Sequence, residues 1–246
     1  MKKDLTFFEG KIIAHRGYHG EKYGIPENSM LSFRKAIEKG YAIEIDLHLL
    51  KDGNIVVMHD DTTTRMTGVD KILKNCTYND LKDLRLNNTN EHIPLLQEVL
   101  ELVDGKVPLL IEYKYDLKAG ILEEKSMEIL KQYKGKFAIQ SFSPFSVKWF
   151  KDNYKEIPRG QLSYDYKDEN IGFFKKIIMK NLFTNIINKP DFISYSIKSM
   201  PRKRITKLRE KGLIIAGWTI KNKKDYDFAK KYCDLFISEY MDEYAE

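Results

Sequence analysis

Short apolar runs rich in β-branched residues alternate with stretches of helical periodicity along nearly the whole chain. The runs have the length of strands, and glycine, proline or polar residues bound them. They predict eight strands at Lys11–His15, Ala42–His48, Val107–Tyr113, Phe137–Ser141, Arg159–Ser163, Phe192–Tyr195, Leu213–Trp218 and Leu235–Ser238. A further short run, Asn54–Met58, follows an Asp-Gly turn and predicts an extra strand.

Helical patterns fill the gaps between these runs, and several begin or end at capping residues. The predicted helices are Ser29–Lys39, Leu95–Val103, Gly120–Tyr133, Pro144–Asn153, Ile171–Ile187, 201–211 and Lys223–Tyr232, with a small helical turn at Asn79–Leu84. Strands and helices that alternate in this way predict an α/β fold, a (β/α)8 TIM barrel with a small insertion after the second strand. An open doubly wound sheet is the alternative.

The length of 246 residues suits a single barrel domain, which we expect to span residues 1–246. Residues 51–94 are too many for an ordinary loop between a strand and a helix. We therefore expect them to form an insertion over the rim of the barrel.

The formal charge of +6 favours anionic partners, but the lysines are scattered and indicate no nucleic-acid footprint. The two cysteines, Cys76 and Cys233, are expected to be partly buried thiols without a disulfide. Charged residues at positions 4, 9 and 11 interrupt any signal-peptide core, and no run of 18 apolar residues occurs. A cytoplasmic location is the simplest expectation, and the oligomeric state stays open.

Polar residues stand at the mouth ends of the first predicted strands. They are His15 and Arg16, then Glu44 and Asp46, then Glu112 and Lys114, with His59 at the end of the extra strand. Residues two apart on a strand share a face, so the carboxylates should meet at one rim. Three carboxylates supply the hard oxygen ligands that Mg²⁺ or Ca²⁺ prefers.

Two histidines beside such a cation suit general acid–base cleavage of a phosphate ester. Arg16 and Lys114 would hold the remaining phosphate oxygens. Taken singly, each residue also has a structural explanation, such as an ion pair between Arg16 and Asp46. Burial of all these polar groups together would cost folding free energy, which indicates that they serve a function.

The other histidines carry weaker signals. His48 continues the face of Glu44 and Asp46, and we expect it to support the site from behind or to lie at the surface. His19 and His92 fall in loops and are expected to be solvated.

Nine motifs occur in the order and at the spacing of a known family. They are His15-Arg16-Gly17, Pro26-Glu27-Asn28, Glu44-Ile45-Asp46, Lys51-Asp52-Gly53, Val56–Asp60, Ile93–Leu100, Ile111–Lys114, Gln140–Pro144 and Gly217–Ile220. From about Ile12 to Ser238 the chain resembles the glycerophosphodiester phosphodiesterase family. It departs from the family pattern at Leu50, at Lys221 and at residues 238–240.

The resemblance implies hydrolysis of a small-molecule glycerophosphodiester to sn-glycerol 3-phosphate and an alcohol, with one divalent cation. By the same resemblance, His15 and His59 are catalytic, and Glu44, Asp46 and Glu112 bind the metal. Arg16 binds phosphate, Lys114 lines the site and Trp218 walls the pocket.

Three other functions are alternatives. Lysophospholipase D activity on a larger lysolipid would use the same site. A non-catalytic phosphate-binding barrel would not need both histidines and all three carboxylates. A metal-dependent sugar isomerase would need more ligands from the later strands, which lack an obvious set.

Apolar residues and lysines share the predicted helix 171–187. Packing against the outside of the barrel is the favoured interpretation of its apolar stripe. A weak contact with a membrane surface is the alternative.

Overall fold

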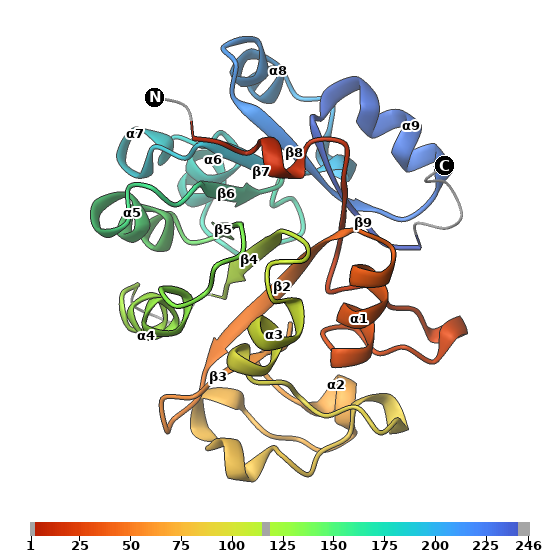
Figure 1. Cartoon of the computed structure of the whole chain (residues 1–246). Coiled ribbons are helices and arrows are strands. Elements are labelled where there is room, and N and C mark those ends of the chain that lie inside the picture. The colour runs from red at the N-terminus through yellow and green to blue at the C-terminus, as the bar shows by residue number, and fades with distance from the viewer. Residues whose placement is uncertain (1–2, 115–118, 241–246) are drawn as a thin grey trace.

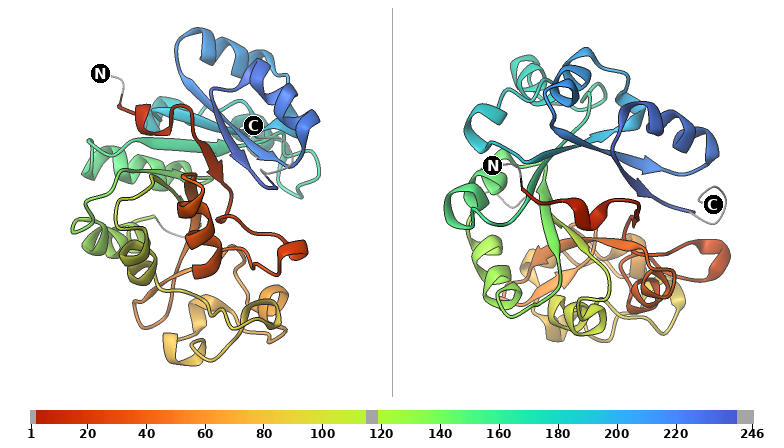
Figure 2. Two further views of the ribbon diagram at one scale, coloured as in Figure 1. Left: turned by 45° about the vertical axis from the view of Figure 1, so that its right-hand side comes forward. Right: turned by 45° about the horizontal axis from the view of Figure 1, so that its top comes forward.

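The computed structural model describes residues 3–114 and 119–240, so both ends of the expected 1–246 domain and residues 115–118 lie outside the described residues. Eight parallel strands close into a barrel that helices surround (Figures 1 and 2). The ring closes because β1 pairs with both β2 and β9. A ninth strand, β3, runs antiparallel to the end of β2. The expected TIM barrel is confirmed.

The strands are β1 Ile12–Ala14, β2 Ala42–Leu49, β3 Ile55–Val57, β4 Leu109–Tyr113, β5 Phe137–Ser141, β6 Arg159–Ser163, β7 Phe192–Ser196, β8 Ile214–Ile220 and β9 Leu235–Ser238. The α-helices are α1 Met30–Glu38, α2 Thr64–Thr67, α3 Leu96–Val103, α4 Ile121–Leu130, α5 Pro144–Asn153, α6 Phe173–Lys180, α7 Asn185–Asn188, α8 Lys203–Glu210 and α9 Lys223–Tyr232. Short 3-10 helices are η1 Thr6–Phe8, η2 Glu21–Tyr23, η3 Leu73–Asn75, η4 Tyr78–Asp80, η5 Leu86–Asn88 and η6 Ile197–Ser199. Each predicted strand is present and ends within two residues of its predicted bounds.

The prediction of one helix over 171–187 is wrong. The helix ends after Lys180, and α7 begins only at Asn185. Between them Leu182 has a left-handed backbone (φ 57°) and buries its side chain in the main core. Arg204 Nε donates to the carbonyl oxygen of Asn181, which a continuing helix would have used. Tertiary contacts thus end the helix where the apolar periodicity continues.

Alternation along the strands explains why polar side chains gather at the barrel mouth. The inward-facing residues of the lower layer are apolar, among them Ala42, Leu110 and Ala138, and Leu5 and Phe8 pack against this layer. Residues two positions further along the same strands face the same way. In β2, β4 and β5 those residues are Glu44, Glu112 and Gln140, and Glu112 lies opposite Asp46 on β2 and opposite Gln140 on β5.

Residues 51–94 form a layer of their own beside the end of β2, at the bottom of Figure 1. Met58, Met66, Leu73 and Leu81 belong to a separate apolar cluster within it. The backbone of Val57 donates to Pro94 O at 2.8 Å, which ties β3 to the chain that re-enters the barrel. This segment carries His59 to the mouth.

Both cysteines are buried free thiols, as expected. Among the described residues, no helix combines the length and the apolar character that a membrane crossing requires.

Candidate active site

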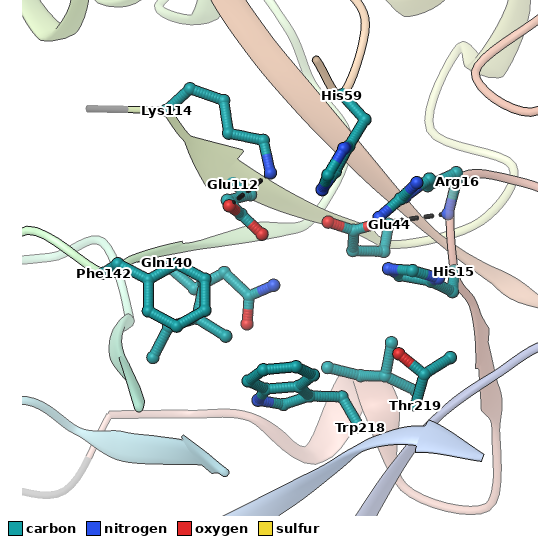
Figure 3. Close-up of a pocket in the computed structure, with 12 residues that line it drawn as sticks. His15, Arg16, Glu44, His59, Glu112, Lys114, Gln140, Phe142, Trp218 and Thr219 are labelled. Atoms are coloured by element: carbon teal, nitrogen blue, oxygen red, sulfur yellow. Dashed lines mark hydrogen bonds and ion pairs between the residues drawn. The ribbon is translucent and has the colours of Figure 1, made fainter. Parts of the chain in front are cut away.

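A pocket of about 80 Å³ opens at the carboxyl ends of the barrel strands (Figure 3). Seven of the eight predicted site residues line it: His15, Arg16, Glu44, His59, Glu112, Lys114 and Trp218. The eighth, Asp46, lies beneath them, and its carboxylate is grouped with those of Glu44 and Glu112. The structure therefore brings all eight residues together.

A tight turn after β1 sets Arg16 against the carboxylates. Arg16 adopts a left-handed backbone (φ 56°), and its N–H donates to Glu44 Oε2 at 3.0 Å. Gly17 follows with φ +81°, and a Cβ there would lie 2.3 Å from Ser32 Oγ. Glycine is thus required both for its backbone conformation and for the close approach of α1.

Glu44, Asp46 and Glu112 form a buried carboxylate cluster, with one oxygen of each within 4.8 Å of the others. Burial and the neighbouring carboxylates raise the pKa of Glu44 well above its usual range, and burial also raises that of Glu112. Burial opposes ionisation of Asp46 too, but Lys114 and Arg16 outweigh it and hold the pKa of Asp46 low. Glu44 Oε1 is buried and has no hydrogen-bond partner among the residues that the structure describes. An unpartnered oxygen in a cluster of three carboxylates suits a hard divalent cation.

The ammonium of Lys114 lies between two of these carboxylates, 2.7 Å from Asp46 Oδ1 and 2.6 Å from Glu112 Oε1. These partners raise the pKa of Lys114 although burial opposes it. Asn28, which is buried, donates to Asp46 Oδ2 at 2.8 Å and fixes that carboxylate from the other side.

Each of the two site histidines is backed by a carboxylate. His15 Nδ1 lies 2.8 Å from Glu239 Oε1, and His59 Nδ1 lies 2.7 Å from Asp60 Oδ1. Burial lowers the pKa of His15 to about 4, against the opposing effect of Glu239, and burial lowers that of His59 as well. A neutral imidazole that donates from Nδ1 keeps its lone pair on Nε2. Both rings line the pocket (Figure 3).

His48 supports this arrangement from behind, which is one of the two roles expected for it. It is buried, and its Nε2 lies 3.2 Å from the carbonyl oxygen of His59. The expectation for His19 is wrong, because His19 is only partly exposed and its Nε2 is buried without a hydrogen-bond partner. Its ring lies against Tyr240, at a centroid distance of 6.5 Å, and this contact shields it from solvent. His92 is partly exposed beside Glu98.

Arg65, in the insertion, links the two sides of the charged site. Its guanidinium contacts Asp60 at 2.6 Å and Glu27 at 2.7 Å. Glu27 in turn accepts from Arg16 at 2.8 Å. One residue therefore connects the carboxylate behind His59 with the carboxylate that holds Arg16.

An aromatic wall faces the charged residues across the pocket. The rings of Phe142, Tyr164 and Trp218 meet edge-on, with centroid distances between 5.7 and 6.2 Å. Gln140 lies between this wall and Glu112, and its Oε1 is buried without a hydrogen-bond partner.

Two wider recesses adjoin the pocket. One of about 460 Å³ shares His59, Glu112, Lys114 and Phe142 with it. The other, of about 290 Å³, shares His15, Arg16 and Thr219 and extends along polar residues. The central pocket therefore opens in two directions.

Six polar residues of the site had no role in the sequence interpretation: Glu27, Asn28, Asp60, Arg65, Gln140 and Glu239. Four of them stand inside the motifs quoted above, and one of these, Asp60, directly follows His59. Arg65 lies outside every quoted motif, and Glu239 falls where the chain departs from the family pattern. A second departure, Lys221, lies 2.8 Å from Glu239 Oε2, so two departures meet behind His15.

Comparison with known proteins agrees with the fold. The sequence model of the glycerophosphoryl diester phosphodiesterase family matches residues 15–243. The chain belongs to this family. YhdW of Bacillus subtilis (strain 168), a candidate glycerophosphodiester phosphodiesterase, is 32% identical over 87% of this chain and 87% of its own length.

A second relative and a solved structure extend the comparison. A glycerophosphodiester phosphodiesterase of Bacillus altitudinis is 34% identical over 72% of this chain and 76% of its own. A phosphodiesterase of Oleispira antarctica, solved with the product sn-glycerol-3-phosphate, superposes with a TM-score of 0.76 at 22% identity. That superposition covers 94% of this chain and 93% of the other, and it shows the shared barrel fold.

Proposed function

We propose that this chain hydrolyses a glycerophosphodiester to sn-glycerol 3-phosphate and an alcohol, within one domain over 1–246. The observation that carries the proposal is the pair of carboxylate-backed imidazoles, His15 and His59, on one pocket with a buried carboxylate cluster. Membership of the glycerophosphoryl diester phosphodiesterase family supports the substrate class. The two recesses support it as well, because a diester has two substituents to place on either side of its phosphorus.

In this proposal the two histidines exchange protons with the reacting phosphate. One imidazole takes the proton of the attacking oxygen, and the other, which enters the step as imidazolium, gives its Nε2 proton to the departing alcohol. Glu239 and Asp60 hold the two rings in the tautomer that presents Nε2 to the pocket. Each carboxylate also stabilises the imidazolium that forms when its histidine takes a proton.

Arg16 and Lys114 would hold the non-bridging phosphate oxygens. Arg16 Nε is buried and makes no hydrogen bond, although it lies 3.6 Å from Asp46 Oδ2. That N–H can donate to an anionic ligand in the pocket. Trp218 closes the opposite side and excludes water from the charged half.

We propose that Glu44, Asp46 and Glu112 hold one divalent cation, Mg²⁺ or Ca²⁺. The unpartnered Glu44 Oε1 and the density of buried negative charge support this assignment. Such a cation, when bound, polarises the phosphoryl oxygens and neutralises charge that develops on them.

The test is release of glycerol 3-phosphate from glycerophosphocholine, measured with a coupled dehydrogenase. We expect turnover by the protein as purified, its loss with EDTA, and its recovery with Mg²⁺ or Ca²⁺. Turnover that survives exhaustive chelation would contradict the cation assignment. Phosphate binding without turnover under any metal would instead identify a non-catalytic phosphate-binding barrel.

A parallel assay with lysophosphatidylcholine tests the second enzyme candidate, lysophospholipase D activity at the same site. The exposed apolar side chains of α6 favour including this lipid substrate. Preference for the lysolipid by kcat/KM would identify the lipid, and not the small diester, as the substrate.

A further inference from the structure

The segment from α6 to α7 exposes an unusual number of apolar side chains. We call Phe173, Phe174, Ile178, Phe183, Ile186 and Ile187 the α6–α7 surface. It holds six of the eleven large hydrophobic side chains that are exposed in the described part of the chain. Phe173 is 71% exposed, Phe174 80% and Ile186 79%, and no residue of α6 is buried. The expectation that this segment packs its apolar stripe on the barrel is therefore wrong for α6.

The backbone that carries this surface is held firmly against the barrel. Leu182 is buried in the main core, and Arg202 donates to Asn181 Oδ1 at 3.0 Å. Asn188 is buried and donates to Gln161 Oε1, and Lys151 Nζ donates to Ile187 O. These anchors hold the backbone that follows α6 and runs through α7 against the barrel. Their exposure is a property of the folded chain.

The segment that carries this surface has charged residues of a single sign. Residues 170–190 contain four lysines, at positions 175, 176, 180 and 189, and neither aspartate nor glutamate. The nearest acidic residues in sequence before them are Asp168 and Glu169, and Glu169 accepts from Tyr164. Phenylalanine and isoleucine beside lysine is the composition of segments that lie in the interface of an anionic membrane. Protein–protein interfaces, in contrast, are depleted in lysine.

The α6 part of this surface lies next to the mouth of the barrel. The chain leaves β6 through Tyr164, whose ring contacts Trp218 in the aromatic wall. Nine residues later it enters α6, and Lys176 Nζ returns to the carbonyl oxygen of Lys167 at 3.1 Å. In Figure 1 α6 and α7 lie together outside β6 and β7. A bilayer against this surface would be near the pocket.

We propose that the α6–α7 surface docks this protein onto an anionic phospholipid bilayer, with Phe173 and Phe174 entering the head-group region. Docking stands on the surface itself. Its consequence, a pocket held near a source of lipid-derived diesters, rests on the proposed function. Lysines and apolar side chains act together here, so binding should fall with rising salt and with loss of either component.

Vesicle co-sedimentation tests the proposal with the full chain. We expect binding to phosphatidylglycerol vesicles at low salt, weaker binding to phosphatidylcholine vesicles, and at least a roughly tenfold loss in Phe173→Ser/Phe174→Ser. Lys175→Glu/Lys180→Glu should lose binding to phosphatidylglycerol only. Ile121→Ser is the matched control, since Ile121 is 60% exposed on α4, outside the surface.

Turnover of soluble glycerophosphocholine should be the same in these variants as in the parent, which separates docking from catalysis. A parent protein that stays in the supernatant at low salt would overturn the proposal. So would equal sedimentation of the double phenylalanine variant. A concentration-dependent dimer that this variant abolishes would assign the surface to a second copy of the chain instead.

Discussion

The two halves of the barrel mouth differ in chemistry. The ends of β1, β2 and β4 carry the imidazole, guanidinium, ammonium and carboxylate groups, which contact one another over 2.6–3.0 Å. The ends of β5, β6 and β8 carry an amide and apolar side chains, among them Leu162 and Trp218. The groups that react with the substrate and the side chains that enclose it therefore come from different strands of the barrel. The apolar half lowers the local dielectric, which strengthens every interaction of the charged half.

The largest effect should come from the histidines of the charged half. We expect His15→Ala and His59→Ala each to lower kcat by about 10²–10⁴-fold, because each removes a proton-transfer group. The measurement is kcat for glycerol 3-phosphate release. His92→Ala, in a loop outside the pocket, is the control. Full activity in the double variant His15→Ala/His59→Ala would refute the acid–base assignment.

Arg65 tests whether the charged half works as one connected unit. Lysine is a point charge and cannot bridge Asp60 and Glu27 as the planar guanidinium does. We expect Arg65→Lys to lower kcat/KM by up to about 10²-fold through misplacement of His59 and Arg16. Guanidinium added to Arg65→Ala should restore part of the loss.

Arg85→Lys is the control for Arg65, since Arg85 lies in the same insertion and donates to the backbone carbonyls of Lys82 and Leu84. Equal kinetics in Arg65→Lys and the parent would show that the bridge positions nothing.

Glu239 influences how the charged half responds to pH. Its carboxylate stabilises the protonated form of His15, so replacing it with a neutral amide should lower the pKa of His15 further below about 4. We expect Glu239→Gln to shift the His15 titration, followed by NMR, to lower pH and to reduce kcat by about tenfold. Lys221→Gln removes the cation from the other oxygen of Glu239, so the His15 pKa should not fall in that variant. An upward shift in Glu239→Gln would contradict the pairing.

The apolar half should give the smallest effect and a different kinetic signature. Trp218→Leu thins the wall without removing a charged group, so KM should rise about 2–10-fold while kcat changes little. Trp149→Leu, on α5 outside the pocket, is the matched control. A large fall in kcat for Trp218→Leu would break the division between the two halves.

Local pattern was sufficient for most of the fold because each strand carries its own signal. Side chains alternate along Ala42–Leu49, so that isoleucine and leucine face the surrounding helices and Glu44 and Asp46 face the inside of the barrel. This alternation is visible in the sequence. The segment from α6 to α7 is the exception. Its apolar periodicity continues through Leu182, but that side chain is buried in the core. Arg204 donates a hydrogen bond to the carbonyl oxygen of Asn181. The periodicity of apolar residues cannot show which residue will be bound by an element that is distant in sequence.

The sequence by itself determined the barrel, the strand ends that bear His15, Glu44 and Glu112, and the chemistry those residue types support. Only the tertiary structure decided how they are paired. Glu239 reaches His15 across 224 positions, and Arg65 joins two carboxylates from separate segments. A carboxylate in a loop gives the same sequence signal whether it is solvated by water or hydrogen-bonded to an imidazole. Burial and partner are set by chain closure, so orientation and pKa in this site belong to the folded state.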